Sequence, residues 1–203
     1  MKKIKFEKIN KQLNFHQLKK LKLILKLENQ TSILANLSRK NIEKYLQEVV
    51  KSKDLELFVV NQKNIIGYAI LARKPKFLIH NFEKFKLNFF FDLLFGLKFI
   101  SLFNIIISKL DFDSIMISRF YKKIVLNSLN LNLLAIEKRY QSKGLGKKFL
   151  KYIFKNSNFK SKYITCEIDN VKSKSFYQKK LDFKHIGKKI RFPKFMDVLS
   201  KRL

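Results

Sequence analysis

The chain has 203 residues, of which 46% are hydrophobic and 14% aromatic, so it can bury a sizeable core and is not a disordered protein. Its 45 Lys+Arg against 15 Asp+Glu give a net charge of +30, which raises the question of a nucleic-acid or anionic-membrane partner. Lysine, asparagine, isoleucine and phenylalanine dominate together, as the codon bias of an A/T-rich genome would produce. We therefore attribute the charge mainly to a solvated basic surface and do not expect nucleic acid as a partner.

The cysteine and histidine content gives no sign of a disulfide or a metal site. Cys166 is the single cysteine, no histidine cluster lies near it, and it falls within a predicted strand, so we interpret it as inert core. His16, His80 and His185 are scattered and are assigned to structural roles. The charged opening MKKIKFEKIN lacks the architecture of a signal peptide. The sequence thus predicts a reduced, cytoplasmic protein without a metal.

The first 74 residues are predicted to form a strand, two helices and two further strands. Apolar residues alternate in KIKFEKIN, and they recur at helical spacing in two later segments, the second of which has Ser38 as its N-cap. A polar NQKN turn then joins two short apolar strands. The predicted elements are a strand at 3–10, helices at 13–29 and 38–52, and strands at 55–60 and 65–72.

The segment from residue 75 to about residue 125 is rich in aromatic residues and is predicted as two helices that meet at Gly96. Its stretch 87–108 is apolar, but Asp92 and Lys98 offset most of the free energy that membrane insertion would gain. A single crossing would also place strands of one sheet on opposite sides of a bilayer. A transmembrane span is therefore not expected.

Regular alternation of strands and helices resumes after this segment. The strand LNLNLLAI is followed by the turn QSKGLG and the helix KKFLKYIFKN. A strand, a helix and a closing pair of strands complete the chain. These predicted elements lie at 129–136, 147–156, 163–168, 171–181, 183–192 and 195–203.

The turn QSKGLG contains two of the five glycines in the chain, Gly144 and Gly146. It places backbone N–H groups at a helix N-terminus, where the macrodipole also favours an anion. Glycine permits positive φ and removes Cβ atoms that would keep a phosphate from the backbone. The third glycine of a dinucleotide fingerprint and the lysine-serine pair of a triphosphate loop are both missing. The turn therefore predicts a diphosphate site of another kind.

Gln141, Gly144 and Gly146 in this turn resemble the coenzyme A loop of the GNAT N-acetyltransferase superfamily, with its pattern Gln/Arg-x-x-Gly-x-Gly/Ala. The preceding LLAIEKRY resembles the fourth strand of that family. About thirty residues later DNVKSKSFYQKKLDF resembles its next signature, in which Asn170 follows a strand and Tyr177 comes seven positions on. The resemblance covers the element order of residues 1–74 and, with motifs, residues 128–203.

The resemblance implies a single α+β domain over residues 1–203. Its mixed, mainly antiparallel sheet of about seven strands would be flanked by helices, with a helical insertion at about 75–125 between the third and fourth strands. One departure is Asp182-Phe183, where the family has Gly-Phe, and it sits one residue late. Aspartate tolerates the left-handed C-cap conformation, so we expect the turn to survive with an altered helix register.

The activity that the resemblance implies is transfer of an acetyl group from acetyl-coenzyme A, as co-substrate, to an amine. Two groups would be catalytic: the backbone N–H of Ile136, which would polarise the thioester carbonyl, and Tyr177, which would protonate the departing thiolate. The helical position of Tyr177 is equally compatible with a core ring, and Asn170 with a helix cap. Residues implied in coenzyme A binding are Leu134, Ile136, Gln141, Ser142, Lys143, Gly144, Leu145, Gly146, Lys147, Asn170 and Tyr177.

A general base is not identified by the sequence. Glu137 follows the fourth strand, where the family exposes the side chain, and Asn130 and Asn132 stand where a carboxylate would otherwise reach inward. Proton removal through water is an equal alternative. Lys147 and Lys148 either meet the nucleotide phosphates or belong to a solvated face.

The acceptor we expect is the primary amine of a small molecule, such as an amino sugar. In the insertion, Phe99, Phe103 and Ile106 share a helical face that should pack against the sheet as a wall of the acceptor pocket, with Asn104 pointing elsewhere. Alternatives are a protein N-acetyltransferase and a non-catalytic module that binds RNA or a membrane through its basic face. A homodimer, or peripheral membrane contact through residues 84–110, is also left open.

Overall fold

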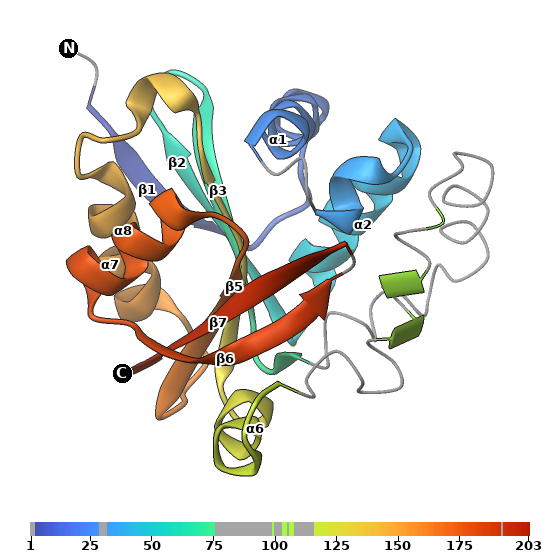
Figure 1. The fold of residues 1–203 in the computed structure, drawn as a ribbon. Coiled ribbons are helices and arrows are strands. Elements are labelled where there is room, and N and C mark those ends of the chain that lie inside the picture. The colour runs from blue at the N-terminus through green and yellow to red at the C-terminus, as the bar shows by residue number, and fades with distance from the viewer. Residues whose placement is uncertain are drawn as a thin grey trace.

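The protein is built around a seven-stranded sheet in the order β1-β2-β3-β4-β5-β7-β6 (Figure 1). The structure is a computed structural model that describes residues 3–28, 32–75, 116–191 and 193–203, together with residues 99, 103, 104, 106 and 107. All neighbouring strands are antiparallel except β4 and β5, which are parallel. The predicted fold class, a mixed and mainly antiparallel sheet flanked by helices, is confirmed.

The first half of the chain follows the predicted order. Ser38 caps the second long helix, since its Oγ accepts a hydrogen bond from the backbone N–H of Asn41 at 3.3 Å. The strands around the NQKN turn are almost entirely buried, as expected for the centre of a sheet covered on both faces. The elements are β1 (Lys5–Ile9), α1 (Phe15–Glu28), η1 (Ile33–Asn36), α2 (Arg39–Lys51), β2 (Leu55–Asn61) and β3 (Ile65–Ala72).

The second half contains one short helix that the sequence analysis did not separate from the insertion. This helix, α6 (Arg119–Leu126), begins at Ser118, whose Oγ accepts from the backbone N–H of Tyr121 at 3.5 Å. Apart from a short 3₁₀ helix at Lys138–Tyr140, which was not predicted, the remaining elements match their predicted positions to within two residues. They are β4 (Leu129–Ile136), η3 (Lys138–Tyr140), α7 (Leu145–Asn156), β5 (Tyr163–Ile168), α8 (Val171–Leu181), β6 (Lys184–Arg191) and β7 (Lys194–Arg202).

Helices cover both faces of the sheet (Figure 1) and enclose two large hydrophobic cores, while a smaller third cluster joins Val125 of α6 to Ile186 and Val198. One core joins α1 and α2 to the sheet, with Leu21, Leu46 and Tyr68 fully buried. The other core lies under α7 and α8 and includes Phe58 and Phe149. Alternate residues of β2 and β3 therefore point into opposite cores, and both strands read as continuous apolar runs.

The sheet opens between β4 and β5. These two strands pair at only two positions, Leu129 with Ile164 and Asn130 with Thr165, so the last six residues of β4 diverge from β5. A register shift between β3 and β4 makes Asn132 an extra residue in β4, and bulges of this kind bend a strand. The result is a gap between two parts of one sheet, at the end of β4 that leads into the glycine turn.

The predicted helical pair at 75–125 lies almost wholly outside the described residues. Where side chains are described, the predicted orientation is wrong: Phe99, Phe103 and Ile106 are about half exposed, whereas Asn104 is buried. The periodicity identified which residues share a face, but periodicity does not specify which face meets the protein. None of the helices in the described part of the chain has the length and hydropathy that a bilayer crossing requires.

Candidate active site

The end of β4 presents backbone groups to the gap. The backbone N–H of Glu137 donates to the carbonyl of Ile66 at 2.9 Å, and antiparallel partners alternate between facing each other and facing away. By that alternation, the N–H and C=O groups of Leu134 and Ile136 point away from β3 and towards the gap. An extended ligand with amide groups can therefore bond to this strand as an added strand would.

The turn that follows β4 leads directly into the N-terminus of α7. Ser142 and Gly144 both have left-handed backbones, with φ of 61° and 72°, which glycine adopts without strain. Gly144 occupies the N-cap position and, having no side chain, leaves the first N–H groups of α7 without a side-chain cap. Such uncapped N–H groups at the positive end of a helix dipole form a site for a phosphate or another anion.

Gly146 serves a different purpose from Gly144. Its backbone is helical, but a Cβ there would lie 3.1 Å from the Phe176 ring and 3.8 Å from Cδ1 of Ile136. The glycine therefore allows close packing of α7 on α8 rather than a positive φ. The end of β4, the start of α7 and the ring of Phe176 consequently meet at one point beside the gap.

Tyr177 follows Phe176 and lies between α8 and β5. Its ring packs edge-on against Phe176 and Phe183, with centroid distances of 5.3 and 5.2 Å, and the residue is 5% exposed. Burial raises the pKa of Tyr177 well above its usual value, and the nearby Cys166 on β5 raises it further. The phenol therefore keeps its proton at physiological pH and is available as a proton donor. Cys166 is itself buried and free, as predicted, and burial raises its pKa.

Asn170 is the N-cap of α8. Its Oδ1 accepts from the backbone N–H of Ser173 at 2.8 Å, and its Nδ2 donates to Asp169 at 3.0 Å. The capping interpretation of Asn170 is thus confirmed. At the other end of α8, Asp182 adopts the left-handed C-cap conformation with φ of 59°, so the turn that departs from the family pattern is preserved.

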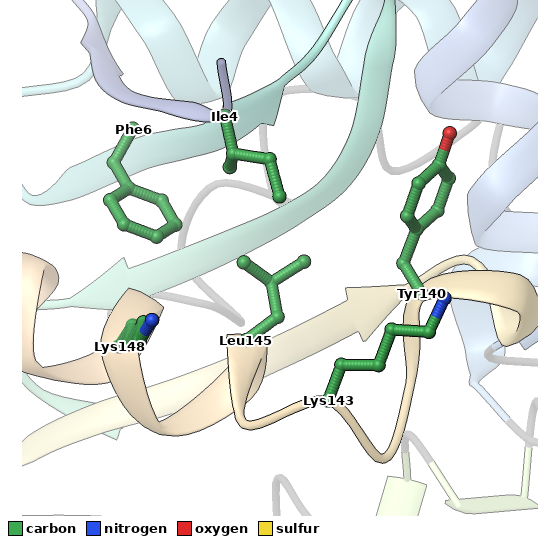
Figure 2. A pocket seen from close by; sticks show the side chains of 6 residues that line it. All are labelled: Ile4, Phe6, Tyr140, Lys143, Leu145 and Lys148. Atoms are coloured by element: carbon green, nitrogen blue, oxygen red, sulfur yellow. The ribbon is translucent and has the colours of Figure 1, made fainter. Parts of the chain in front are cut away.

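Two lysines in and after the turn line a cavity on the side of β1. Lys143 and Lys148 are exposed and line a cavity of about 320 Å³ between β1 and the turn, with Leu145 directed towards Ile4 and Phe6 (Figure 2). Tyr140 also lines this cavity and donates its hydroxyl to Gln62 at 2.8 Å. Lys147 is exposed as well. Lys143 and Lys148 thus face this cavity, and the turn offers a ligand in the gap the uncapped backbone N–H groups of α7.

Polar, uncharged side chains lie on the face of β4 towards α2. Asn130 is buried, and the side chain of Asn132 lies near the hydroxyl of Tyr45 on α2. Burial raises the pKa of Tyr45, and the polar side chain of Asn132 opposes the increase. At the point where β4 and β5 part, the hydroxyls of Ser128 and Thr165 bond to each other at 2.8 Å. This face offers hydrogen-bonding groups without a net charge.

Two carboxylates near the ends of β4 and β5 are held by cations. Glu137 forms ion pairs with Lys20 of α1 at 2.6 Å and with Arg139 at 2.9 Å. Glu167 on β5 pairs with Lys189 at 3.0 Å and Arg191 at 3.1 Å. Burial raises the pKa of Glu167, but the two cations outweigh burial and lower it to about 2. A carboxylate with so low a pKa is a poor general base.

Glu167→Gln should lower the free energy of unfolding at neutral pH by about 1–3 kcal/mol, because it leaves two cations with a neutral partner. Since the pKa of Glu167 is depressed in the folded state, its stabilisation is present above about pH 4.5, the usual glutamate value, and is lost as pH falls to about 2. Urea unfolding of both proteins from pH 7 to pH 2 tests this. Parallel stability profiles of the wild type and the variant would contradict the ion-pair assignment.

One contact at the site was not predicted from the sequence. Glu28, the last residue of α1, accepts from the backbone N–H of Lys138 at 3.0 Å through Oε1 and from Nε2 of Gln141 at 3.1 Å through Oε2. The same Nε2 of Gln141 also donates to the carbonyl of Ile136 at 2.7 Å. No local sequence signal joins residues more than 100 positions apart, so the contact requires the fold.

The histidines have structural partners where they are described. His16 bonds to Asn64 at 3.3 Å, and His185 pairs with Asp197 at 2.8 Å, while His80 lies outside the described residues. Lys174 of α8 pairs with the same carboxylate at 2.8 Å. Within the described ranges, no group of His, Cys, Asp and Glu side chains has the arrangement of a metal site.

Solved acetyltransferases share this architecture over the whole chain. They include an acetyltransferase from Thermus thermophilus (11% identity, 100% of both chains, TM-score 0.58) and a polyamine N-acetyltransferase from Drosophila melanogaster (11%, 99% and 100%, 0.59). NAA60 from Arabidopsis thaliana, solved in complex with acetyl-CoA, matches at 12% identity over 99% of both chains with a TM-score of 0.53. No family model and no curated protein matches the sequence. The chain therefore has the fold of the GNAT N-acetyltransferases.

Proposed function

We propose that this protein is an acetyl-CoA-dependent N-acetyltransferase that acetylates the primary amine of a small molecule. The observation that carries this proposal is the gap between β4 and β5. Backbone groups of Leu134 and Ile136 face the gap, and it leads to the uncapped N-terminus of α7. Coenzyme A is an extended chain with two amides that ends in a diphosphate. Its amides can bond to the free edge of β4, and its diphosphate can reach the N-terminus of α7.

In this proposal each group has a separate task. The N–H groups of the turn, from Gln141 to Lys147, bind the diphosphate, and the outward N–H of Ile136 or Leu134 polarises the thioester carbonyl. The amine nitrogen attacks the carbonyl carbon, the carbon–sulfur bond breaks, and Tyr177 donates its proton to the sulfur. Asn170 caps the N-terminus of α8 and has no separate task in the reaction.

The proton of the attacking amine leaves to water. Glu137 and Glu167 are each paired with two cations, and Asn130 and Asn132 are not bases. This part of the proposal implies that the amine enters in its neutral form. Activity should then rise with pH towards the pKa of the acceptor amine, because the neutral fraction of the amine increases.

In this proposal the acceptor approaches β4 from the face that carries Asn130 and Asn132, where the side chains favour a polar, uncharged acceptor. Asn130, Asn132 and Tyr45 supply amides and a hydroxyl there, and a strongly basic protein repels polycations. A hydroxyl-rich amine such as an amino sugar fits this lining better than a polyamine. A protein N-terminus remains the alternative acceptor, and NAA60 shows the same fold bound to acetyl-CoA.

The proposal is tested by incubating the purified protein with acetyl-CoA and a panel of amines while free thiol release is followed. The panel contains amino sugars, amino acids, polyamines and peptides with free N-termini. We expect acceptor-dependent thiol release that is greatest with an amino sugar. Binding of RNA with a steep salt dependence, together with no binding of coenzyme A, would instead establish the non-catalytic alternative.

A further inference from the structure

Glu28 occupies a position where a helix ordinarily disfavours a carboxylate. It is the last residue of α1, and the negative end of the helix dipole lies there. The unfavourable position is offset by the two hydrogen bonds that Glu28 accepts from the segment after β4. A residue that breaks a local rule in order to make specific long-range contacts points to a functional site.

The contacts of Glu28 form a chain that ends at the gap. Its Oε2 accepts a hydrogen bond from Nε2 of Gln141, and that nitrogen also donates to the carbonyl of Ile136 at 2.7 Å. Because one amide nitrogen donates to both acceptors, two hydrogen bonds fix the orientation of the Gln141 side chain. The other oxygen of the same carboxylate, Oε1, accepts a hydrogen bond from the N–H of Lys138, where η3 begins.

A second contact keeps α1 against this segment. Lys20 of α1 pairs with Glu137 at 2.6 Å, immediately after β4, and a cavity of about 320 Å³ lies between α1 and residues 137–139. The helix is thus attached at Lys20 and at Glu28, on either side of that cavity. Of these two contacts, only that of Glu28 reaches Gln141.

We infer that Glu28 is a positioning residue for coenzyme A binding, which acts through Gln141 to hold the end of β4 and the glycine turn in the arrangement that accepts the ligand. This inference rests on the proposed function. Glu28 does not need to touch coenzyme A in this role. Its negative charge alone would weaken binding of a diphosphate, so any gain from Glu28 must come from the geometry that it imposes.

Glu28→Gln keeps the size of the side chain and changes the hydrogen bonds that it can form. The carboxamide of glutamine has one acceptor oxygen, so it can keep the bond from Lys138 but then presents its NH₂ group to the NH₂ group of Gln141. Gln141 must rotate, and its bond to the Ile136 carbonyl is lost. We expect coenzyme A to bind roughly tenfold more weakly, equivalent to about 1.4 kcal/mol, with KM for acetyl-CoA raised and kcat unchanged.

The experiment is a double-mutant cycle on the dissociation constant of coenzyme A, measured by calorimetry with the wild type, Glu28→Gln, Gln141→Ala and the double variant. If Glu28 acts through Gln141, Glu28→Gln should weaken binding less than twofold in the Gln141→Ala background. Glu43→Gln is the control, because it removes the same charge from a glutamate of α2 that pairs with Lys22 of α1 instead of contacting the turn. It should leave binding unchanged.

The possible outcomes separate the inference from the proposed function. An equal loss in both backgrounds, no loss at all, or tighter binding by Glu28→Gln would overturn the positioning role, while the wild type still binds coenzyme A. A wild type that does not bind coenzyme A would overturn the proposed function, and this inference with it. Melting temperatures of the ligand-free variants show whether any loss reflects unfolding instead of positioning.

Discussion

Gly144→Asp should abolish the thermal stabilisation that coenzyme A gives to the protein. At a hundred times its dissociation constant, a ligand adds about 2.7 kcal/mol, which raises the melting temperature of a chain of this length by about 5–10 °C. A Cβ at Gly144 has no heavy atom within 4 Å, and aspartate tolerates a φ of 72°, so the variant should fold. Its carboxylate, however, would stand at the N-terminus of α7, where the diphosphate is proposed to bind.

Gly144→Asn is the matched control for this experiment. Asparagine has the same size and the same tolerance of the left-handed conformation, but carries no charge. Both variants should lower the melting temperature of the ligand-free protein by a similar amount, whereas only aspartate should remove the shift completely. An undiminished shift in the aspartate variant would show that coenzyme A does not bind at this turn.

Tyr177→Phe should lower kcat by about 100-fold and leave coenzyme A binding nearly unchanged. General acid catalysis typically contributes 10²–10⁴-fold, and the low end is expected because a thiolate is already a fair leaving group. The raised pKa of Tyr177 adds a second expectation. Since the phenol stays protonated, wild-type kcat should not fall through ionisation of this group below about pH 10.

Tyr152→Phe on α7 provides the comparison, because Tyr152 packs against Phe6 and Phe58 in the same hydrophobic core but away from β5. It removes the same hydroxyl and should leave kcat unchanged. If Tyr177→Phe retains full activity across the pH range, Tyr177 is only a core residue, and the structure already shows that its ring has that role.

The secondary structure could be predicted from local patterns because its signals are local. Ser38 marked the start of α2, and the NQKN turn marked the hairpin of β2 and β3. The insertion had no such markers. Ser118 does cap α6, but the aromatic run before it hid the boundary, and the hydrophobic pattern alone could not say that Asn104 would be buried while Phe103 stayed half exposed.

Predictions at the site succeeded where they depended on backbone conformation. Gly144 was expected to have a positive φ and does, and Asp182 preserves the left-handed turn that glycine provides elsewhere. Gly146 was assigned the same kind of role, but its missing Cβ makes room for Phe176. That reason depends on how α8 packs on α7, and the two helices are separated in the chain by β5. Spacing along the sequence contains no such information.

The two edges of the sheet have a consequence for self-association. Its outermost strands are β1 and β6, and unpaired edge strands invite another chain to add a strand. Lysines stand on both, with Lys5 exposed on β1 and Lys184 and Lys188 exposed on β6, and Ile117 already pairs with β6 at Gly187. Lysine on an edge strand opposes the addition of another strand, because two such edges would bring like charges together. The excess of lysine thus works against aggregation through the strands of this sheet.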